Sequence, residues 1–348
     1  MSINIGLLAE ICEVSGAPGH EQRVREIVLR EVTPLVDEVR IDNMGNVTAI
    51  KKGKSDKKVM IGAHMDEIGF IVTHIDEKGF LRFHTLGGFD PKTLTAQRVI
   101  IHGKKDLVGV MGSKPIHVMS PEERNKPPKI KDFFIDTGMP KEEVEKYISV
   151  GDTITRERKL IEMGNCVNCK SIDNRVSVFI LIEMLRELKD APHNVYGVFT
   201  VQEEVGIRGA NVATQEVQPD FGFGLDTTIA FDVPGAAGHE KITQLGKGTA
   251  IKVMDSSTIC DYRMVEYMKQ TADKHKIEYQ LEILTGGGTD TSGIQRFTPG
   301  GSIAGAVSIP TRHIHQVIEM ADKDDIRKSI DLLCHCIQDL DQYDWSFK

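Results

Sequence analysis

The spacing of apolar residues changes character twice along the chain. Residues 19–36 (GHEQRVREIVLREVTPLV) place apolar side chains at helical intervals, whereas residues 46–53 and 57–66 have the β-branched and alternating character of strands. A helix followed by strands predicts an α/β protein from the start of the chain.

From about Phe70 the chain becomes a series of short strand candidates separated by glycine. These candidates lie at residues 69–76, 79–88, 97–103, 106–112 and 150–156. Short strands of this kind are typical of a small β-barrel or sandwich. Residues 119–147 are rich in proline and charge, and they predict a surface excursion with one short helix at 141–147.

The α/β pattern returns after about Cys166. It predicts helices at 173–188, 261–276 and 324–340 and strands at 195–202, 220–226 and 301–310. Strands that alternate with helices favour a mostly parallel central sheet flanked by helices. We therefore predict one α/β domain, residues 1–69 plus 164–348, interrupted by a β-barrel insert at 70–163.

Composition and charge narrow the class of protein. The chain has 348 residues, 40% of them hydrophobic, which is enough for one large core or two moderate ones. A formal net charge of −8 and a pI near 5.9 argue against a nucleic-acid or membrane partner. No apolar run approaches the ~20 residues of a membrane helix, and the first residues lack the features of a secretory signal. We therefore expect a cytoplasmic protein.

The six cysteines are scattered and do not suggest a disulfide framework. Cys166 and Cys169 form one CxxC, but a structural zinc site needs a second pair of ligands at matching spacing, and none is evident. We interpret the cysteines as reduced, inert thiols.

Candidate chemistry gathers where the predicted strands end, which is where open α/β sheets bind ligands. One strand ends in His64 and Asp66, and another ends in the adjacent pair Glu203 and Glu204. Further candidates are Asp226 and the histidines His313 and His315 at later strand ends, and Asp173 as the N-cap of a helix. A single polar residue at a strand end is ordinary, but several places that all draw on His, Asp and Glu indicate a metal site.

Mixed imidazole and carboxylate ligands suit zinc, cobalt or manganese. Two divalent ions that share one carboxylate need five ligands, and the chain offers His64, Asp173, Glu204, Asp226 and His315. The remaining glutamate, Glu203, is then free to act as general base toward a water held between the ions. Asp66 is placed to orient the imidazole of His64.

Five motifs together give the chain a family resemblance. AHMDEIGF, SIDNR, TVQEEVGIRGA, GLDTT and PTRHIH, in this order, resemble the dinuclear metallopeptidases of family 42, the TET or glutamyl aminopeptidases, some of which carry an endoglucanase label. The resemblance covers nearly the whole chain, including the insert.

The resemblance implies a role for each candidate. His64 and Asp226 hold one metal ion, Glu204 and His315 hold the other, and Asp173 bridges them. Glu203 is the general base and acid, and Asp66 supports His64. It further implies peptide substrates with a free N-terminus, a PDZ-like insert that serves dimerisation, homo-oligomers up to a dodecamer, and a glycine-rich loop at 284–295 that lines the site.

The last motif departs from the family pattern. His313 stands where the family usually has an aromatic residue, and Gln316 and Val317 replace its Ser-Pro. His315 remains the expected ligand, and His313 would reach the same metal only if the strand stayed regular. For Asp290, in the glycine-rich loop, we favour a turn role over a substrate contact.

The sequence leaves the substrate partly open. An aminopeptidase is the reading that the resemblance implies, and a metal-dependent N-acyl deacylase would use the same site. A glycosidase would not need the histidines, and a non-catalytic, shell-forming relative would not need Glu203. Arg208, Arg296 and Arg312 lie near the motifs and are the candidates for recognising an acidic side chain, although we interpret each as structural.

Overall fold

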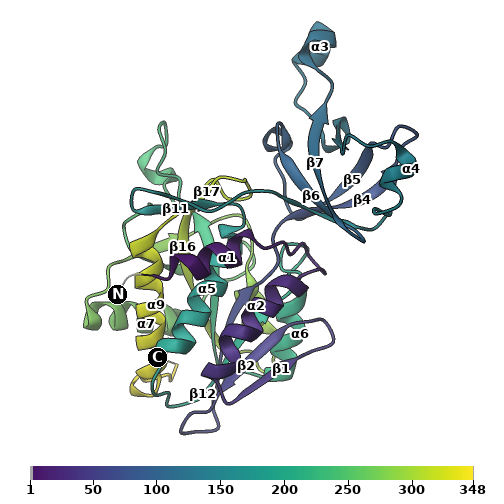
Figure 1. Ribbon diagram of the computed structural model, residues 1–348. Coiled ribbons are helices and arrows are strands. Elements are labelled where there is room, and N and C mark those ends of the chain that lie inside the picture. Colours follow the sequence, from purple (N-terminus) through teal and green to yellow (C-terminus); the bar gives the residue numbers. More distant parts are fainter. Residues whose placement is uncertain (1–2, 348) are drawn as a thin grey trace.

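A computed structural model describes residues 3–347 and divides them into a large α/β part and a smaller barrel (Figure 1). Within these residues, eleven strands form one sheet and six form a closed antiparallel barrel. The predicted fold class, α/β with a central sheet flanked by helices and an additional β-barrel, is confirmed.

The central sheet is mixed, with four parallel strands in its middle. Its order is β1 (Glu38–Ile41), β2 (Val47–Lys51), β12 (Asn194–Thr200), β3 (Lys58–His64), β13 (Phe221–Ile229), β16 (Ile303–Arg312), β17 (Glu319–Asp322), β11 (Cys166–Cys169) and β10 (Ile161–Met163). In addition, β14 (Thr249–Met254) pairs antiparallel with β16, and β15 (Tyr279–Ile283) pairs parallel with β14. The four strands β12, β3, β13 and β16 run parallel, while the outer pairs β1–β2 and β10–β11 are antiparallel. Short connections cannot cross over to a parallel neighbour, so the edge pairs become hairpins.

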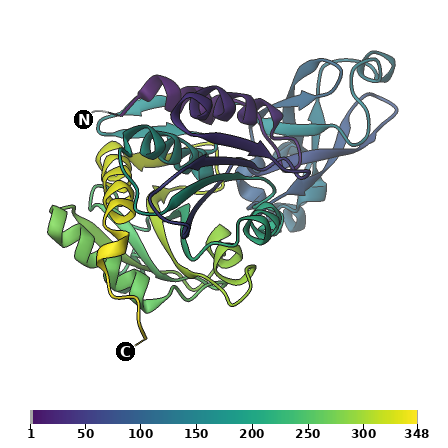
Figure 2. The same cartoon turned by 90° about the horizontal axis from the view of Figure 1, so that it is seen from below.

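Helices cover both faces of this sheet (Figure 2). One face packs in a single large core with α1 (Ile5–Glu13), α2 (Gln22–Val32), α5 (Ile172–Glu187), α7 (Tyr262–His275) and α9 (Lys323–Gln338). The other face packs a smaller cluster against α6 (Arg208–Val217) and α8 (Asp290–Arg296). The alternation of β3 explains this division, since Ile61 faces the large core and Met60 the small one. None of the helices in residues 3–347 is long and apolar enough to cross a membrane.

Two glycines of β13 let α8 lie directly against the sheet. A Cβ on Gly222 would come within 2.2 Å of Ile294 Cγ2, and one on Gly224 within 1.9 Å of Thr291 Oγ1. The alternating sequence FGFGLD therefore sends phenylalanines into the large core and leaves room for α8 on the other face.

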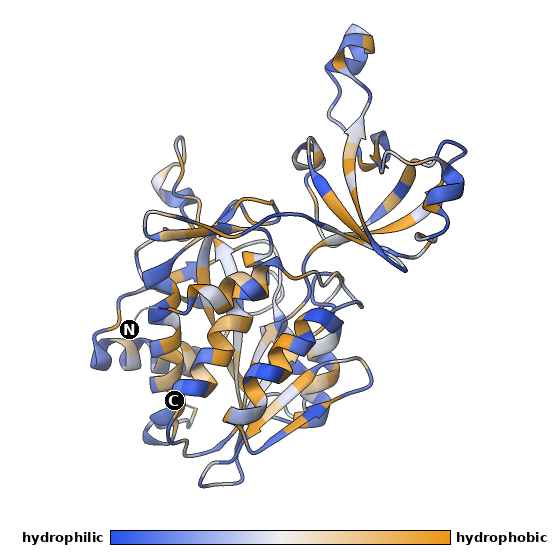
Figure 3. Cartoon of the chain, in the orientation of Figure 1, coloured by the Kyte–Doolittle hydropathy of each residue, from blue (hydrophilic) through white to orange (hydrophobic). Residues whose placement is uncertain are grey.

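The barrel projects to one side of the α/β part, with α3 (Pro121–Arg124) at its outermost tip (Figure 1). Its strands, in order, are β4 (Gly69–Ile75), β5 (Leu81–Leu86), β8 (Phe133–Asp136), β7 (Asp106–Ser113), β6 (Arg98–His102) and β9 (Thr153–Arg156). Apolar residues alternate along these strands (Figure 3) and enclose a separate core around Phe70, Ile101 and Ile135. β8 lies inside the stretch that we expected to be an irregular excursion, and the helix expected at 141–147 is α4 (Lys141–Val144).

The limits of the insert, 70–163, and its role in dimerisation stay predictions. The barrel strands run from Gly69 to Arg156, whereas β10 pairs with β11 in the large sheet. The segment that leads out of the barrel therefore already belongs to the α/β sheet at Ile161.

Candidate metal and active site

The five residues predicted as metal ligands converge at the carboxyl ends of the parallel strands. They come from β3, the start of α5, the turn after β12, strand β13 and the turn after β16. Their ligand atoms form two groups, each within 4.8 Å, composed of His64, Asp173 and Asp226 and of Asp173, Glu204 and His315. Asp173 belongs to both groups.

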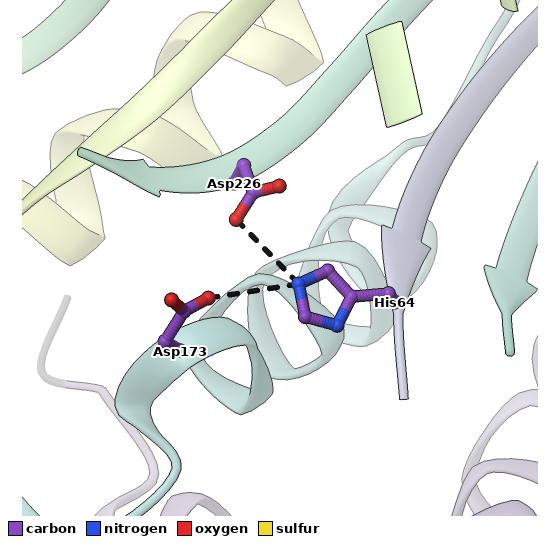
Figure 4. Close-up of side chains that lie close together, drawn as sticks. All are labelled: His64, Asp173 and Asp226. Atoms are coloured by element: carbon purple, nitrogen blue, oxygen red, sulfur yellow. Dashed lines mark ion pairs between the residues drawn. The ribbon is translucent and has the colours of Figure 1, made fainter. Parts of the chain in front are cut away.

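The first group is centred on the imidazole of His64, which is 1% exposed. Its Nε2 lies 3.5 Å from Asp173 Oδ1 and 3.7 Å from Asp226 Oδ1, so that both carboxylates face one ring nitrogen (Figure 4). Burial lowers the pKa of His64, but Asp226, Asp173 and Asp66 outweigh it and hold this pKa well above its usual value. The sequence predicted that the Asp173 side chain caps α5. Its carboxylate points into this cluster instead.

The second group uses the other oxygen of Asp173. Its Oδ2 lies 3.4 Å from His315 Nε2, which is itself 3.5 Å from Glu204 Oε2. Burial raises the pKa of Glu204 to about 8, while Glu204 and Asp173 together raise the pKa of His315 to about 10 against the effect of its own burial. The two oxygens of Asp173 thus face two separate imidazoles, as a bridging carboxylate would.

Glu203 lies beside the first group without joining it. Its Oε2 is 3.8 Å from His64 Nε2, and burial raises its pKa well above the usual value. The backbone N–H groups of Glu203 and Glu204 donate to the two oxygens of Asp66, at 3.0 and 3.1 Å. Asp66 also lies 3.4 Å from His64 Nδ1. Asp66 therefore holds the backbone of Glu203 and Glu204 in addition to its contact with His64. The contact with the glutamate backbone was not expected from the sequence.

The donor set fits divalent metal ions. The carboxylates of Asp173, Glu203, Glu204 and Asp226, whose side chains are at most 10% exposed, surround the imidazoles of His64 and His315. Glu204 Oε1 is buried and has no hydrogen-bond partner within the part of the chain that the structure describes. Buried carboxylates at this density repel one another unless positive charge is supplied, and oxygen and imidazole donors suit zinc, manganese or cobalt.

Behind the ligands lie two residues that the sequence did not single out. Glu319, on β17, accepts a hydrogen bond from the backbone N–H of Asp173 at 2.9 Å. Arg156, at the end of barrel strand β9, donates through Nη1 to the carbonyl oxygen of His315 at 3.0 Å. Neither stands in a recognisable motif, so only the fold brings them to the site.

Asp290 takes neither of the roles weighed for it. It is 1% exposed at the start of α8 and accepts a hydrogen bond from Thr200 Oγ1, below the ligand cluster. Burial raises its pKa to about 7, and its Oδ1 has no hydrogen-bond partner. Asp290 is therefore part of the buried support of the site rather than a surface turn.

His313 does not join the ligand groups. Both His313 and His315 have positive φ angles, 61° and 65°, so the chain leaves the regular strand at Arg312. This break turns His315 toward Asp173 and leaves His313 exposed. The cysteines are free thiols, and burial raises the pKa of Cys169 to about 12, which keeps it protonated.

A cavity of about 720 Å³ opens onto the ligands. One wall consists of the glycine-rich segment from Leu284 to Thr289, as expected of part of the loop 284–295, and another of Gly88, Phe89 and Asp90 from the barrel. The ligand groups therefore face a space of the size of a small-molecule binding site.

Fold and site together define an α/β enzyme with candidate metal ligands at the carboxyl ends of its parallel strands. The family model of M42 glutamyl aminopeptidase matches residues 45–332. The chain therefore belongs to the M42 family, whose peptidases are metallopeptidases, and it is a hydrolase of peptide bonds.

Individual relatives agree with this assignment. A solved aminopeptidase from the archaeon Desulfurococcus kamchatkensis is 38% identical with a TM-score of 0.93, over 96% of this chain and 94% of that one. The lysyl aminopeptidase of Pyrococcus furiosus is 32% identical over 98% of both chains. The TET1 peptidase of Pyrococcus horikoshii, which assembles into a tetrahedron or a large octahedral shell, is 30% identical with a TM-score of 0.85, over 96% of this chain and 98% of that one.

Proposed function

We propose that the chain is a dinuclear metal-dependent aminopeptidase that removes residues from the free N-terminus of peptides. The observation that carries this proposal is the position of Asp173, whose two oxygens lie 3.5 and 3.4 Å from the imidazoles of His64 and His315. A carboxylate shared in this way is the feature that two adjacent ions require.

Each ion then has its own ligands beside the shared one. His64 and Asp226 hold the first, and Glu204 and His315 hold the second. Zinc is the metal that we favour, with cobalt and manganese as alternatives, since all three accept imidazole and carboxylate together.

When bound by these residues, the two ions would acidify a water and polarise the carbonyl group of the substrate. Glu203 supplies the proton transfers. Its carboxylate takes a proton from the attacking water and returns it to the leaving amine. Asp66 fixes the backbone of Glu203 at 3.0 Å and so keeps this carboxylate beside the reacting group.

We further propose that the chain works as a homo-oligomer in the cytoplasm. The similarity to a relative that forms closed shells supports assembly, and we assign the formation of dimers to the barrel. Val108 and Val110, on barrel strand β7, are 61% and 48% exposed and offer apolar surface for such contacts. Sedimentation velocity of the wild type and of Val108→Glu tests this, and we expect the variant to shift toward smaller species.

Hydrolysis of matched substrates tests the reaction. Metal-stripped protein is restored with zinc, cobalt or manganese and given unblocked and N-acetylated aminoacyl amides. We expect metal-dependent cleavage of the unblocked compounds alone and a loss of at least about 100-fold in kcat for Glu203→Gln, with metal content unchanged. Cleavage confined to the N-acetyl compounds would establish a deacylase, and no turnover by protein that binds two ions would indicate a non-catalytic relative.

A further inference from the structure

We propose that the cavity selects a neutral, aliphatic side chain at the N-terminus of the substrate, of the size of leucine or methionine. This inference rests on the proposed aminopeptidase function and concerns the space beside the metal ligands. Apolar side chains from three elements line that space, namely Ile207 before α6, Ile229 at the end of β13 and Leu284 after β15.

The cation in this part of the cavity is already paired. Lys252, on β14, is 1% exposed, and its Nζ lies 3.1 Å from Asp255 Oδ2 and 2.8 Å from Glu282 Oε1. One ammonium thus faces two carboxylates. A carboxylate on the substrate would have to displace one of them, and it would enter a cluster that has no net positive charge to offer.

The two carboxylates are equally unavailable to a basic substrate. Asp255 Oδ1 accepts from the backbone N–H groups of Ser257 and Thr258 and from the Ser257 hydroxyl, and Oδ2 accepts from Lys252 and Thr289. Glu282 is fully buried behind Lys252 and does not line the cavity. A lysine or arginine side chain would therefore lose hydration without gaining a free partner.

The arginines that could have attracted an acidic substrate face elsewhere. Arg312 forms a bidentate pair with Asp232, with both N–O distances at 2.6 Å. Arg208 donates to the side chain of Gln202, and Arg296 donates to the carbonyl oxygen of Ser292. None of these arginines lines the cavity. The family description as glutamyl aminopeptidases therefore does not transfer to the specificity of this chain.

Asp90 is the remaining charged group on the rim outside the ligand cluster and the Lys252 cluster. It stands on the barrel wall next to Gly88, whose backbone adjoins the ring of His315, and it is exposed to solvent. Its carboxylate accepts from the backbone N–H of Lys92. Solvent screening and this hydrogen bond leave it a weak attractor for a basic side chain.

Relative kcat/KM for leucyl, glutamyl and lysyl amides of one fluorescent amine, measured with the metal-restored full chain, tests the inference. We expect the leucyl compound to exceed each charged one by at least about tenfold. Glutamyl or lysyl turnover equal to or above leucyl turnover would overturn it. Failure of the proposed function has a different signature, namely that no unblocked compound is cleaved or that Glu203→Gln is as active as the wild type.

A pair of neighbouring variants tests the cavity wall itself. Leu284→Arg adds an unpaired cation to the lining, whereas Ile283→Arg adds the same charge one residue earlier, at a side chain that is 56% exposed and outside the cavity. We expect Leu284→Arg to raise the glutamyl-to-leucyl ratio at least about tenfold and Ile283→Arg to leave it unchanged. Equal ratios in the two variants, with both folded by circular dichroism, would contradict the inference.

Removal of one counter-ion of Lys252 is a second test of the proposed specificity. Glu282→Gln removes one of its two carboxylates, so the three-residue cluster changes from a net negative to a neutral formal charge and repels a substrate carboxylate less. The glutamyl-to-leucyl ratio is expected to rise several-fold, while the exposed change Glu278→Gln on the same segment leaves it constant. A ratio that does not rise in Glu282→Gln, in protein that still binds two ions, would show that Lys252 does not face the substrate.

Discussion

Arg156 donates a hydrogen bond through Nη1 to the backbone carbonyl oxygen of His315 at 3.0 Å, although the two residues belong to the barrel and to the α/β part. Arg156 is 2% exposed, and its Nε and Nη2 have no hydrogen-bond partner among residues 3–347. Its guanidinium also lies over the ring of Phe89, 5.4 Å from the ring centre. Because the hydrogen bond of this buried group goes to His315, we infer that the position of His315 depends on it.

We therefore expect Arg156→Met to weaken binding of the second metal ion by about 10-fold or more, as loss of support behind a ligand does. Titration of the stripped protein with cobalt, followed by its visible absorption, measures this. Arg158→Met, two residues further along, serves as the control, because it removes a half-buried arginine whose Nη1 donates to the carbonyl oxygen of its own neighbour Glu157. Equal affinities in the two variants would show that Arg156 does not position His315.

The shared position of Asp173 predicts an asymmetry in metal content. His315→Ala removes a ligand of one ion only, so the variant should retain about one equivalent of metal when the wild type holds two. Asp173→Asn alters a ligand of both groups and should lower both affinities. Elemental analysis after dialysis distinguishes these outcomes. Retention of both ions by Asp173→Asn would mean that Asp173 does not bridge them.

Asp325, in the first turn of α9, makes stability depend on pH. Burial raises its pKa to about 6, although it accepts hydrogen bonds from the backbone of Gly246 and Gly248. The native state then binds this proton more tightly than the unfolded state does. The free energy of unfolding therefore falls as pH rises from about 4 to about 6, by up to about 3 kcal/mol from this group.

Asp325→Asn removes that dependence, because the amide does not titrate in this range. Urea unfolding of wild type and variant at several pH values measures the effect. We expect the free energy of unfolding of the wild type to fall relative to that of the variant as pH rises. A constant difference between the two proteins across this range would contradict the assignment.

Glu67 is the buried counter-ion of two cations, Lys170 and Arg175. Its Oε1 lies 2.7 Å from Lys170 Nζ and 3.5 Å from Arg175 Nη2, and all three side chains are at most 2% exposed. Removing one partner from such a cluster leaves an uncompensated charge, so Glu67→Gln should lower the free energy of unfolding by about 3–5 kcal/mol. The exposed pair of Glu10 and Arg30 provides the comparison, and Glu10→Gln should cost less than about 1 kcal/mol. Comparable losses in the two variants would argue against this account.

The ligand candidates were accessible from sequence because each lies at or near the end of an element that the sequence predicts. His64 ends one buried strand and Glu203 follows another, so the topology of parallel strands brings them to one edge. The proposed roles of these residues stay predictions, but the clustering that those roles require is present. The same logic predicted the central strands, whose apolar runs are continuous.

The residues that hold the ligands in place could not be predicted from the sequence in this way. Arg156 and Glu319 stand in segments without a chemical motif, and they reach the site only because the barrel docks above β16 and because β17 pairs with β11. The function of Asp290 was missed for a similar reason, since its partner Thr200 is distant in sequence. Spacing along the chain reports which face of an element a residue occupies, and it does not report which other element covers that face.

The two ends of the barrel lie next to each other, because its first strand β4 pairs with its last strand β9 through Phe70 and Ile154. Excision of the barrel would leave every proposed ligand in the remaining chain. It would nevertheless remove Arg156 from behind His315 and Phe89 from the cavity wall. A minimal catalytic unit therefore cannot be obtained by trimming, and exchange of barrels between relatives must carry these two residues along.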